Sequence, residues 1–241
     1  MLKTDAVNVE YLDLNSETIN DEIYDLKGIE GFTNLKSLYA IGNKLSEIDL
    51  SENKLLDTLN LSGNNLNFID LTHNPNLLMV DLKVNELTLI HGLSKATNLK
   101  WLNLSFNFFE EYIIVNPNLE SFLMTNNELA SFDADIAANL KTLYLLTNKL
   151  VHVDLSNNKY IEALNVSNNR LININLGQKD ELNYFSCFSN RLSILDVSNI
   201  NKLDFLIADR NPNLFCIKID DGQAIPALTL SDYQQVNTNC D

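Results

Sequence analysis

The chain has 241 residues, 45% of them hydrophobic, which is enough to bury a core in one large domain or two small ones. Its formal net charge of −15 argues against nucleic acid as a partner, because a polyanion needs a surface rich in Lys and Arg. A negatively charged lipid leaflet is disfavoured for the same reason. No apolar run approaches the roughly 20 residues that cross a bilayer, so no membrane insertion is expected.

Residues 1–34 are expected to form an N-terminal cap and an irregular first coil, ahead of a regular repeat. Val9, Leu12 and Leu14 have the spacing of an early strand, but Glu17 stands where later repeats carry an asparagine. The opening stretch MLKTDAVNVEYLDLN lacks the apolar core of a signal peptide. From this stretch we expect either a cytoplasmic protein or a mature or recombinant fragment.

Residues 35–213 repeat with a period of about 21 residues. An asparagine recurs at intervals of 21, 21, 22, 20, 21, 21, 21 and 21, and apolar residues keep fixed offsets from it, as Leu59 and Leu61 do before Asn64. The consensus L-x-x-L-x-L-x-x-N-x-L is the leucine-rich-repeat signature, and the chain resembles proteins of that family. The recurring asparagines are Asn43, Asn64, Asn85, Asn107, Asn127, Asn148, Asn169, Asn190 and Asn211.

The short unit looks most like bacterial, internalin-like secreted repeats. Two units have second halves that read Ile-Asp-Leu-Ser at residues 48–51 and Val-Asp-Leu-Ser at residues 153–156. The resemblance implies a mostly β or α-β solenoid, a leucine-rich-repeat horseshoe with a parallel β-sheet on its concave face and little helix. It also implies a secreted or cell-surface location, and recognition of a protein or glycan ligand on the concave face.

The asparagines are expected to be structural. Each L-x-L is a short strand whose leucines point into the coil, and successive strands pair in parallel about 4.8 Å apart. The chain then turns sharply, and a buried asparagine side chain can satisfy backbone groups of its own turn and the next. A second polar column, six residues on, is interpreted as turn caps on the outer side of the coil rather than as a catalytic carboxylate array. That column holds Asp49, Asp70, Asp133, Asp154 and Asp196, with Asn175 in register.

Residues 214–241 are expected to form a C-terminal cap. Leu214, Ile217 and Ile219 are predicted to make a last strand, and the tail after them to cover the open end of the core. Cys187 occupies the position of a core leucine and is predicted to be a buried, inert thiol. The resemblance to secreted bacterial repeat proteins implies a disulfide between Cys216 and Cys240, and hence an oxidising compartment. Sequence alone leaves the connectivity open.

Residues two, four and six positions before each asparagine are expected to face outward on the concave sheet. Large apolar side chains there fall into two groups, separated by the polar coil of Ala163, Asn165 and Ser167. Contiguous exposed apolar side chains favour a binding surface, although cross-strand packing would also place aromatic residues on a sheet. The candidate ligand-binding residues are Met79, Trp101, Phe106, Phe108, Leu123, Tyr144 and Leu146, followed by Tyr184, Phe188, Phe205 and Ile207.

No catalytic or metal-binding motif accompanies these features. The three histidines lie in different repeats, no Cys/His spacing suits zinc, and neither a nucleophile elbow nor a phosphate-binding loop occurs. We therefore expect a monomeric, non-catalytic extracellular binding module that needs no cofactor. The alternative is a structural or adhesive spacer within a larger surface protein, and an enzyme would need a further domain for its chemistry.

Overall fold

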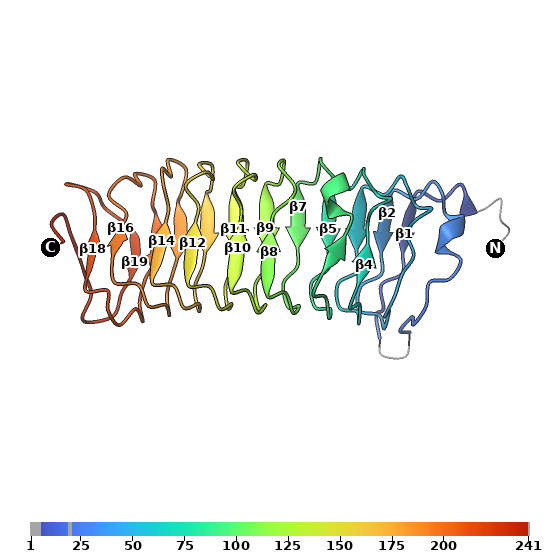
Figure 1. Ribbon diagram of the computed structural model, residues 1–241, viewed down its shortest axis with the longest axis horizontal. Coiled ribbons are helices and arrows are strands. Elements are labelled where there is room, and N and C mark those ends of the chain that lie inside the picture. Colours follow the sequence, from blue (N-terminus) through green and yellow to red (C-terminus); the bar gives the residue numbers. More distant parts are fainter. Residues whose placement is uncertain (1–5, 19–20, 241) are drawn as a thin grey trace. The chain divides into compact units, whose positions relative to one another are not determined.

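The computed structural model describes residues 6–18 and 21–240, so parts of the expected N-terminal cap (1–5 and 19–20) lie outside the described residues. The chain divides into two units. The first comprises residues 1–109 and 115–119, and the second comprises residues 110–114 and 120–241. Within each unit, short parallel strands stack coil upon coil with very little helix (Figure 1).

In the first unit, each strand of the main sheet pairs in parallel with the strand one coil away. A two-stranded sheet forms elsewhere on these coils, from β4 (Ile69–Asp70) and β6 (Ile90–His91). Two 3-10 turns, η1 (Ile29–Gly31) and η2 (Leu93–Lys95), also belong to this unit. The main sheet runs in the order β1 (Tyr11–Asp13), β2 (Ser37–Tyr39), β3 (Thr58–Asn60), β5 (Met79–Asp81) and β7 (Trp101–Asn103).

The second unit repeats the same design. Its main sheet contains β9 (Ser121–Leu123), β11 (Thr142–Tyr144), β13 (Ala163–Asn165), β15 (Tyr184–Ser186), β17 (Phe205–Ile207) and β19 (Ala227–Thr229). Smaller parallel sheets pair β8 (Glu111–Ile113) with β10 (Ser131–Asp133), β12 (His152–Asp154) with β14 (Asn173–Asn175), and β16 (Leu195–Asp196) with β18 (Cys216–Lys218) and β20 (Gln235–Asn237).

The core of each unit is the column of apolar side chains that the repeat predicts. In the coil around Asn64, the side chains of Leu56, Leu59, Leu61 and Leu66 are completely buried. Each strand contributes its middle residue to the core, and the register pairs Leu38 with Leu59 on adjacent strands. Stacking therefore buries one continuous apolar column, which no single coil could do alone.

The outer turns are capped as predicted. Asp70 Oδ1 accepts a hydrogen bond from the backbone N–H of Thr72 at 2.8 Å, and Asp154 Oδ1 accepts one from Ser156 at 2.8 Å. Hydrogen bonds from the side chains of Thr72 and Ser156, and then these backbone bonds, lower the pKa of the two carboxyl groups. Asn175, in register with them, accepts a bond from Gly177 N–H at 3.2 Å. The column is a set of turn caps.

The prediction for the C-terminus was wrong in one respect. The segment from Leu214 to Ile219 is not the last strand, because β18 pairs with β16 and β20 and does not join the main sheet. The spacing of 11 residues from Leu203 to Leu214 is half a coil, so the chain has reached the other side of the same coil. The tail then builds one further coil, through β19 and β20, and leaves the core residue Leu228 37% exposed.

Candidate functional site

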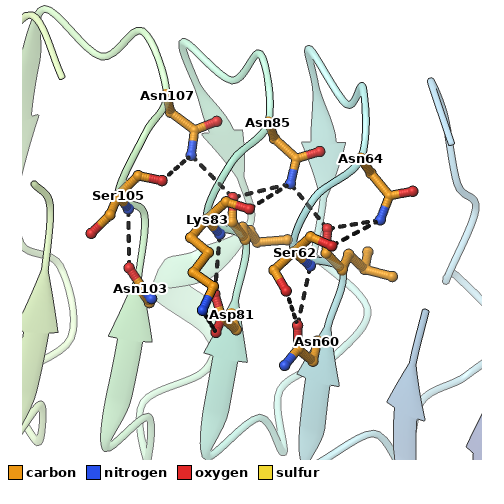
Figure 2. A network of polar contacts seen from close by, with 11 residues as sticks. Asn60, Ser62, Asn64, Asp81, Lys83, Asn85, Asn103, Ser105 and Asn107 are labelled. Carbon is orange, nitrogen blue, oxygen red and sulfur yellow. Dashed lines mark hydrogen bonds and ion pairs between the residues drawn. The ribbon is translucent and has the colours of Figure 1, made fainter. Parts of the chain in front are cut away.

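The ladder asparagines hold the turns at which the main strands end. Asn64 Nδ2 donates to the carbonyl oxygens of Ala40 and Leu61, both at 2.9 Å, and its Oδ1 accepts from the N–H of Leu45 at 3.0 Å. Figure 2 shows the same arrangement repeating at Asn85 and Asn107. Each side chain thus joins its own turn to the preceding coil, and these buried backbone groups are satisfied.

The residue immediately before each ladder asparagine has a left-handed backbone conformation. Gly42 and Gly63 take it in the first repeats, with φ of 72° and 69°. Later repeats place Val84 (φ 56°), Phe106 (φ 58°) and Thr147 (φ 58°) there, which are residue types that rarely adopt a positive φ. This conformation was not predicted from the sequence, although glycine or asparagine recurs at this position of several repeats. Phe106, whose ring is exposed, therefore has a backbone conformation that is set by this turn.

Small polar residues on the outward face of the main sheet are less exposed than expected. Asn60, Asp81 and Asn103 are no more than 9% exposed. In each case the side-chain oxygen accepts a hydrogen bond from the N–H two residues later, as Asn60 does from Ser62 at 3.1 Å and Asp81 from Lys83 at 3.1 Å (Figure 2). Burial raises the pKa of Asp81. These side chains belong to the turn and are not available to a ligand.

The first unit carries four of the candidate apolar residues. Met79 and Trp101 lie directly opposite each other on β5 and β7, and both are partly exposed. Phe106 and Phe108 follow in the turn after β7 and are 49% and 54% exposed. The first unit therefore presents large apolar side chains to solvent on and just beyond its strands.

The second unit carries the other seven. Leu123 and Tyr144 lie opposite each other on β9 and β11, and Leu146 follows two residues after Tyr144. Tyr184 and Phe205 lie opposite each other on β15 and β17, with ring centroids 6.4 Å apart. Phe205 is 51% exposed, whereas Leu123, Tyr144, Leu146, Tyr184, Phe188 and Ile207 are partly buried.

The polar coil expected between these two groups is present as β13. It pairs with β11 on one side and β15 on the other. Ser167 is completely buried, and its hydroxyl lies 2.7 Å from that of Ser186 on the next coil. The second unit therefore presents two apolar groups on either side of a polar coil.

No protein-family model matches the chain, and no curated protein matches its sequence. Among solved structures, the chain is similar to the functional domain of InlJ from Listeria monocytogenes, with 23% identity and a TM-score of 0.83 over 98% of this chain and 56% of that one. It is also similar to the Listeria monocytogenes internalin InlF, with 17% identity and a TM-score of 0.52 over 100% of this chain and 90% of that one. The chain has the leucine-rich-repeat fold. It spans about half the length of the InlJ domain.

A third leucine-rich-repeat structure resembles part of the chain. It is the ectodomain of the plant membrane receptor kinase GASSHO1/SCHENGEN3 from Arabidopsis thaliana, solved in complex with CASPARIAN STRIP INTEGRITY FACTOR 2. The two chains share 18% identity and a TM-score of 0.59, over 86% of this chain and 34% of the ectodomain. The likeness is one of fold.

These leucine-rich repeats contain a second polar ladder that the sequence analysis missed. Asn53, Asn74, Asn116 and Asn158 are completely buried, and each side-chain amide donates to two backbone carbonyls of the preceding coil. Ala137 stands at the corresponding phase of another coil, and Lys179 does so in the coil after Asn158. Because asparagine is replaced at these positions, the column has no regular sequence period.

The cysteines are arranged as the resemblance implied. Cys216 and Cys240 form a disulfide across 24 residues, which ties β18 to the end of the last coil. Cys187 is a free thiol, completely buried in the core, and burial raises its pKa. The described part of the chain contains no group of three or more His, Cys, Asp or Glu that could hold a metal ion. Within residues 6–18 and 21–240, no helix has the length and apolar character needed to span a bilayer.

Proposed function

We propose that the chain is a non-catalytic binding module that recognises a protein or glycan ligand through the outward face of its main strands. The observation that carries this proposal is the pair of Tyr184 and Phe205. Their rings lie side by side on neighbouring strands, and half of the Phe205 surface is exposed to solvent. The core lies on the other side of the sheet and is filled by Phe185 and Leu206, so the outward rings are not needed to complete it.

Exposed aromatic and aliphatic side chains on a rigid sheet suit recognition for a physical reason. They contribute apolar contact area at little cost in conformational entropy, and aromatic residues dominate interface energetics. The backbone beneath them is held by the asparagine ladder and by parallel pairing, so the surface is pre-organised. The first unit offers Met79, Trp101, Phe106 and Phe108, and the second offers Tyr144, Leu146, Tyr184, Phe188 and Phe205.

We also propose an extracellular or cell-surface location. The disulfide between Cys216 and Cys240 supports it, because such bonds persist in oxidising compartments. The likeness to internalins of Listeria supports a bacterial surface protein. The GASSHO1/SCHENGEN3 ectodomain, whose fold is similar, was solved with a bound partner, which supports a leucine-rich-repeat surface as a recognition module.

A screen with matched variants tests the proposal. The purified chain is applied to a glycan array and to a displayed peptide library, and the best binder of each kind is titrated against the parent and against Tyr184→Ser, Phe205→Ser and Tyr160→Ser. Tyr160 is the control, because it is 56% exposed but lies in the turn that precedes β13 and not on a main strand. We expect each outward-face substitution to weaken binding at least tenfold, and Tyr160→Ser to leave it unchanged.

Trp101→Ala and Tyr144→Ala extend the test to other positions. A central aromatic anchor contributes about 2 kcal/mol or more to binding. Both variants should fold, because the side chains point away from the core. If none of these outward-face variants binds differently from the parent, the outward face is not the site, and the chain is better explained as a structural or adhesive spacer.

A further inference from the structure

All three arginines of the chain lie on consecutive asparagine turns of the second unit. Arg170 follows the ladder residue Asn169, Arg191 follows Asn190, and Arg210 precedes Asn211. All three side chains are exposed. The repeat does not require arginine at these positions, because the residue after the ladder asparagine is Glu86 or Glu128 in other coils.

Two of these arginines have no acidic partner among the residues that the structure describes. Many lysines of the described residues form ion pairs, among them Lys27, Lys36, Lys44, Lys54, Lys83, Lys141, Lys149, Lys202 and Lys218. Arg210 pairs with Asp209 next to it in sequence, at 3.3 Å. Arg170 and Arg191, by contrast, form no ion pair with any described residue. Acidic residues outnumber basic ones by 32 to 17, yet the guanidinium groups of Arg170 and Arg191 are not neutralised by an ion pair within the described part of the chain.

Two acidic residues that flank these strands lie at the opposite edge of the sheet from the arginines. Glu162 and Asp204 lie at the amino ends of β13 and β17, one residue before each strand begins. The arginines lie beyond the carboxyl ends. A stretch of only five extended residues spans about 16 Å, so the edge with Glu162 and the edge with Arg170 are at least that far apart along the strands. The Debye length at physiological ionic strength is about 8 Å, so carboxylates bound at the arginines are screened from Glu162 and Asp204. Asp209, on the arginine edge, is paired with Arg210.

We infer that the outward face of the second unit binds an acidic peptide segment, with carboxylates against Arg170 and Arg191 and apolar side chains against Tyr184 and Phe205. This inference rests on the proposed function and specifies its partner. The guanidinium group offers a planar pair of donors that fits a carboxylate, and it is the cation most often found at interface centres. Turns of adjacent coils are about 4.8 Å apart, so neighbouring arginines can bind neighbouring acidic residues.

The side chains between the arginines and the acidic edge favour a peptide over an acidic glycan. Sugars gain mainly by stacking on aromatic rings, whereas this surface also offers the aliphatic groups of Leu146 and Ile207. Aliphatic contacts suit the side chains of Val, Leu or Ile. The net charge of −15 opposes acidic ligands at long range, so the local arginines must outweigh it by direct contact.

Three labelled decapeptides provide the probes, in which valine alternates with glutamate, with serine or with lysine. Binding is measured by fluorescence anisotropy at 50 mM and 300 mM NaCl. The glutamate peptide should bind at least tenfold more tightly than the serine peptide at low salt, and this advantage should shrink at high salt. Arg170→Glu and Arg191→Glu should each weaken binding of the glutamate peptide about tenfold and leave the serine peptide unchanged.

Lys159→Glu is the matched control, because it makes the same charge change at an exposed lysine that lies in an outer turn. It should alter binding less than twofold. Equal binding of the glutamate and serine peptides, or equal effects of Lys159→Glu and Arg191→Glu, would refute the acidic partner. Binding of a sulfated oligosaccharide that depends on Arg191, with no binding of the glutamate peptide, would refute the peptide assignment.

The proposed function can fail separately from this inference. If Phe205→Ser and Tyr184→Ser bind the glutamate peptide like the parent while Arg191→Glu does not, the arginine edge binds acids without the sheet face. If the serine peptide binds through Phe205 but glutamate adds nothing, the sheet face binds ligands without an acidic preference. Melting temperatures of all variants confirm that each is folded.

Discussion

The ammonium group of Lys179 takes the place that the side-chain amide of Asn158 has one coil earlier. Asn158 Nδ2 donates to the carbonyl oxygen of Ala134 at 2.9 Å, and Lys179 Nζ donates in the same way to that of Leu155 at 2.8 Å. Lys179 Nζ also donates to the carbonyl oxygen of Leu176. Lys179 is completely buried. The second ladder thus tolerates a cation in a position built for a neutral amide.

Replacing this lysine should stabilise the fold. Burial lowers the pKa of Lys179 to about 8, which means that the folded state disfavours the charged form. Lys179→Asn restores the ladder residue and removes the buried charge, so we expect the free energy of unfolding at pH 7 to rise by about 1–3 kcal/mol. Urea denaturation of the variant and of Lys159→Asn, an exposed control, measures the difference. A variant less stable than the parent would show that the lysine is well accommodated.

The same residue predicts a pH dependence. Its pKa is lower in the folded state than the ordinary value of 10.5, so the unfolded state binds more protons between about pH 8 and pH 10.5. The stability of the parent should therefore rise over this window, relative to Lys179→Asn, by about 3 kcal/mol in total. Below pH 8 the difference should be constant. Parallel denaturation curves of the two proteins at pH 7, 9 and 10.5 test the sign.

Asn148→Ala should destabilise the second unit. Asn148 Nδ2 donates to the carbonyl oxygens of Met124 and Leu145, at 2.9 Å and 3.0 Å, and its Oδ1 accepts from Leu129 N–H at 3.0 Å. Alanine leaves these backbone groups without partners, at a cost of about 1–3 kcal/mol. Asn157→Ala, in an exposed turn, should change stability by less than about 0.5 kcal/mol. Equal melting curves for the two variants would argue against a stabilising ladder.

The left-handed turn position predicts a pair of opposite effects. Val84 is β-branched and has a φ of 56°, whereas asparagine occupies the same position as Asn126 and Asn168. Val84→Asn should raise stability by about 1 kcal/mol, because asparagine adopts this conformation more readily. The reciprocal change, Gly63→Val, should lower stability by a similar amount or more. Thermal unfolding of both variants gives the two shifts, and shifts of the same sign would contradict the explanation.

The disulfide should stabilise the last coil. It closes a loop of 24 residues, so removing it with Cys216→Ser and Cys240→Ser should cost about 3 kcal/mol. Thiol titration of the unreduced, denatured parent should find one reactive thiol, that of Cys187. In the folded protein even this thiol should be unreactive, because it is completely buried. Three reactive thiols in protein never exposed to reductant would contradict the bond.

The sequence by itself determined the fold of this protein. The 21-residue period predicts which side chains point into each coil. The burial of Leu59 and Asn64 and the capping role of Asp70 were therefore predicted from their positions in the repeat. This works because a coil of a solenoid contacts only its neighbours, so the local repeat contains most of the structural information. The resemblance also supplied the pair of Cys216 and Cys240, which spacing could not.

Only the tertiary structure decided which of these side chains are exposed and where the repeat departs from its period. Asn60 and Asp81 share a strand position with Tyr144 and Leu123, yet the first two are buried in their own turns and the others are partly exposed. Exposure depends on side chains from coils 21 residues away, and a repeat pattern does not contain that information. The strand at Cys216 lies on the other side of its coil from the main sheet. The repeat pattern did not predict this position, because it only identifies residues that are a whole period apart. The second ladder, broken by Ala137 and Lys179, became evident only when carbonyl groups of one coil lay within reach of side chains from the next.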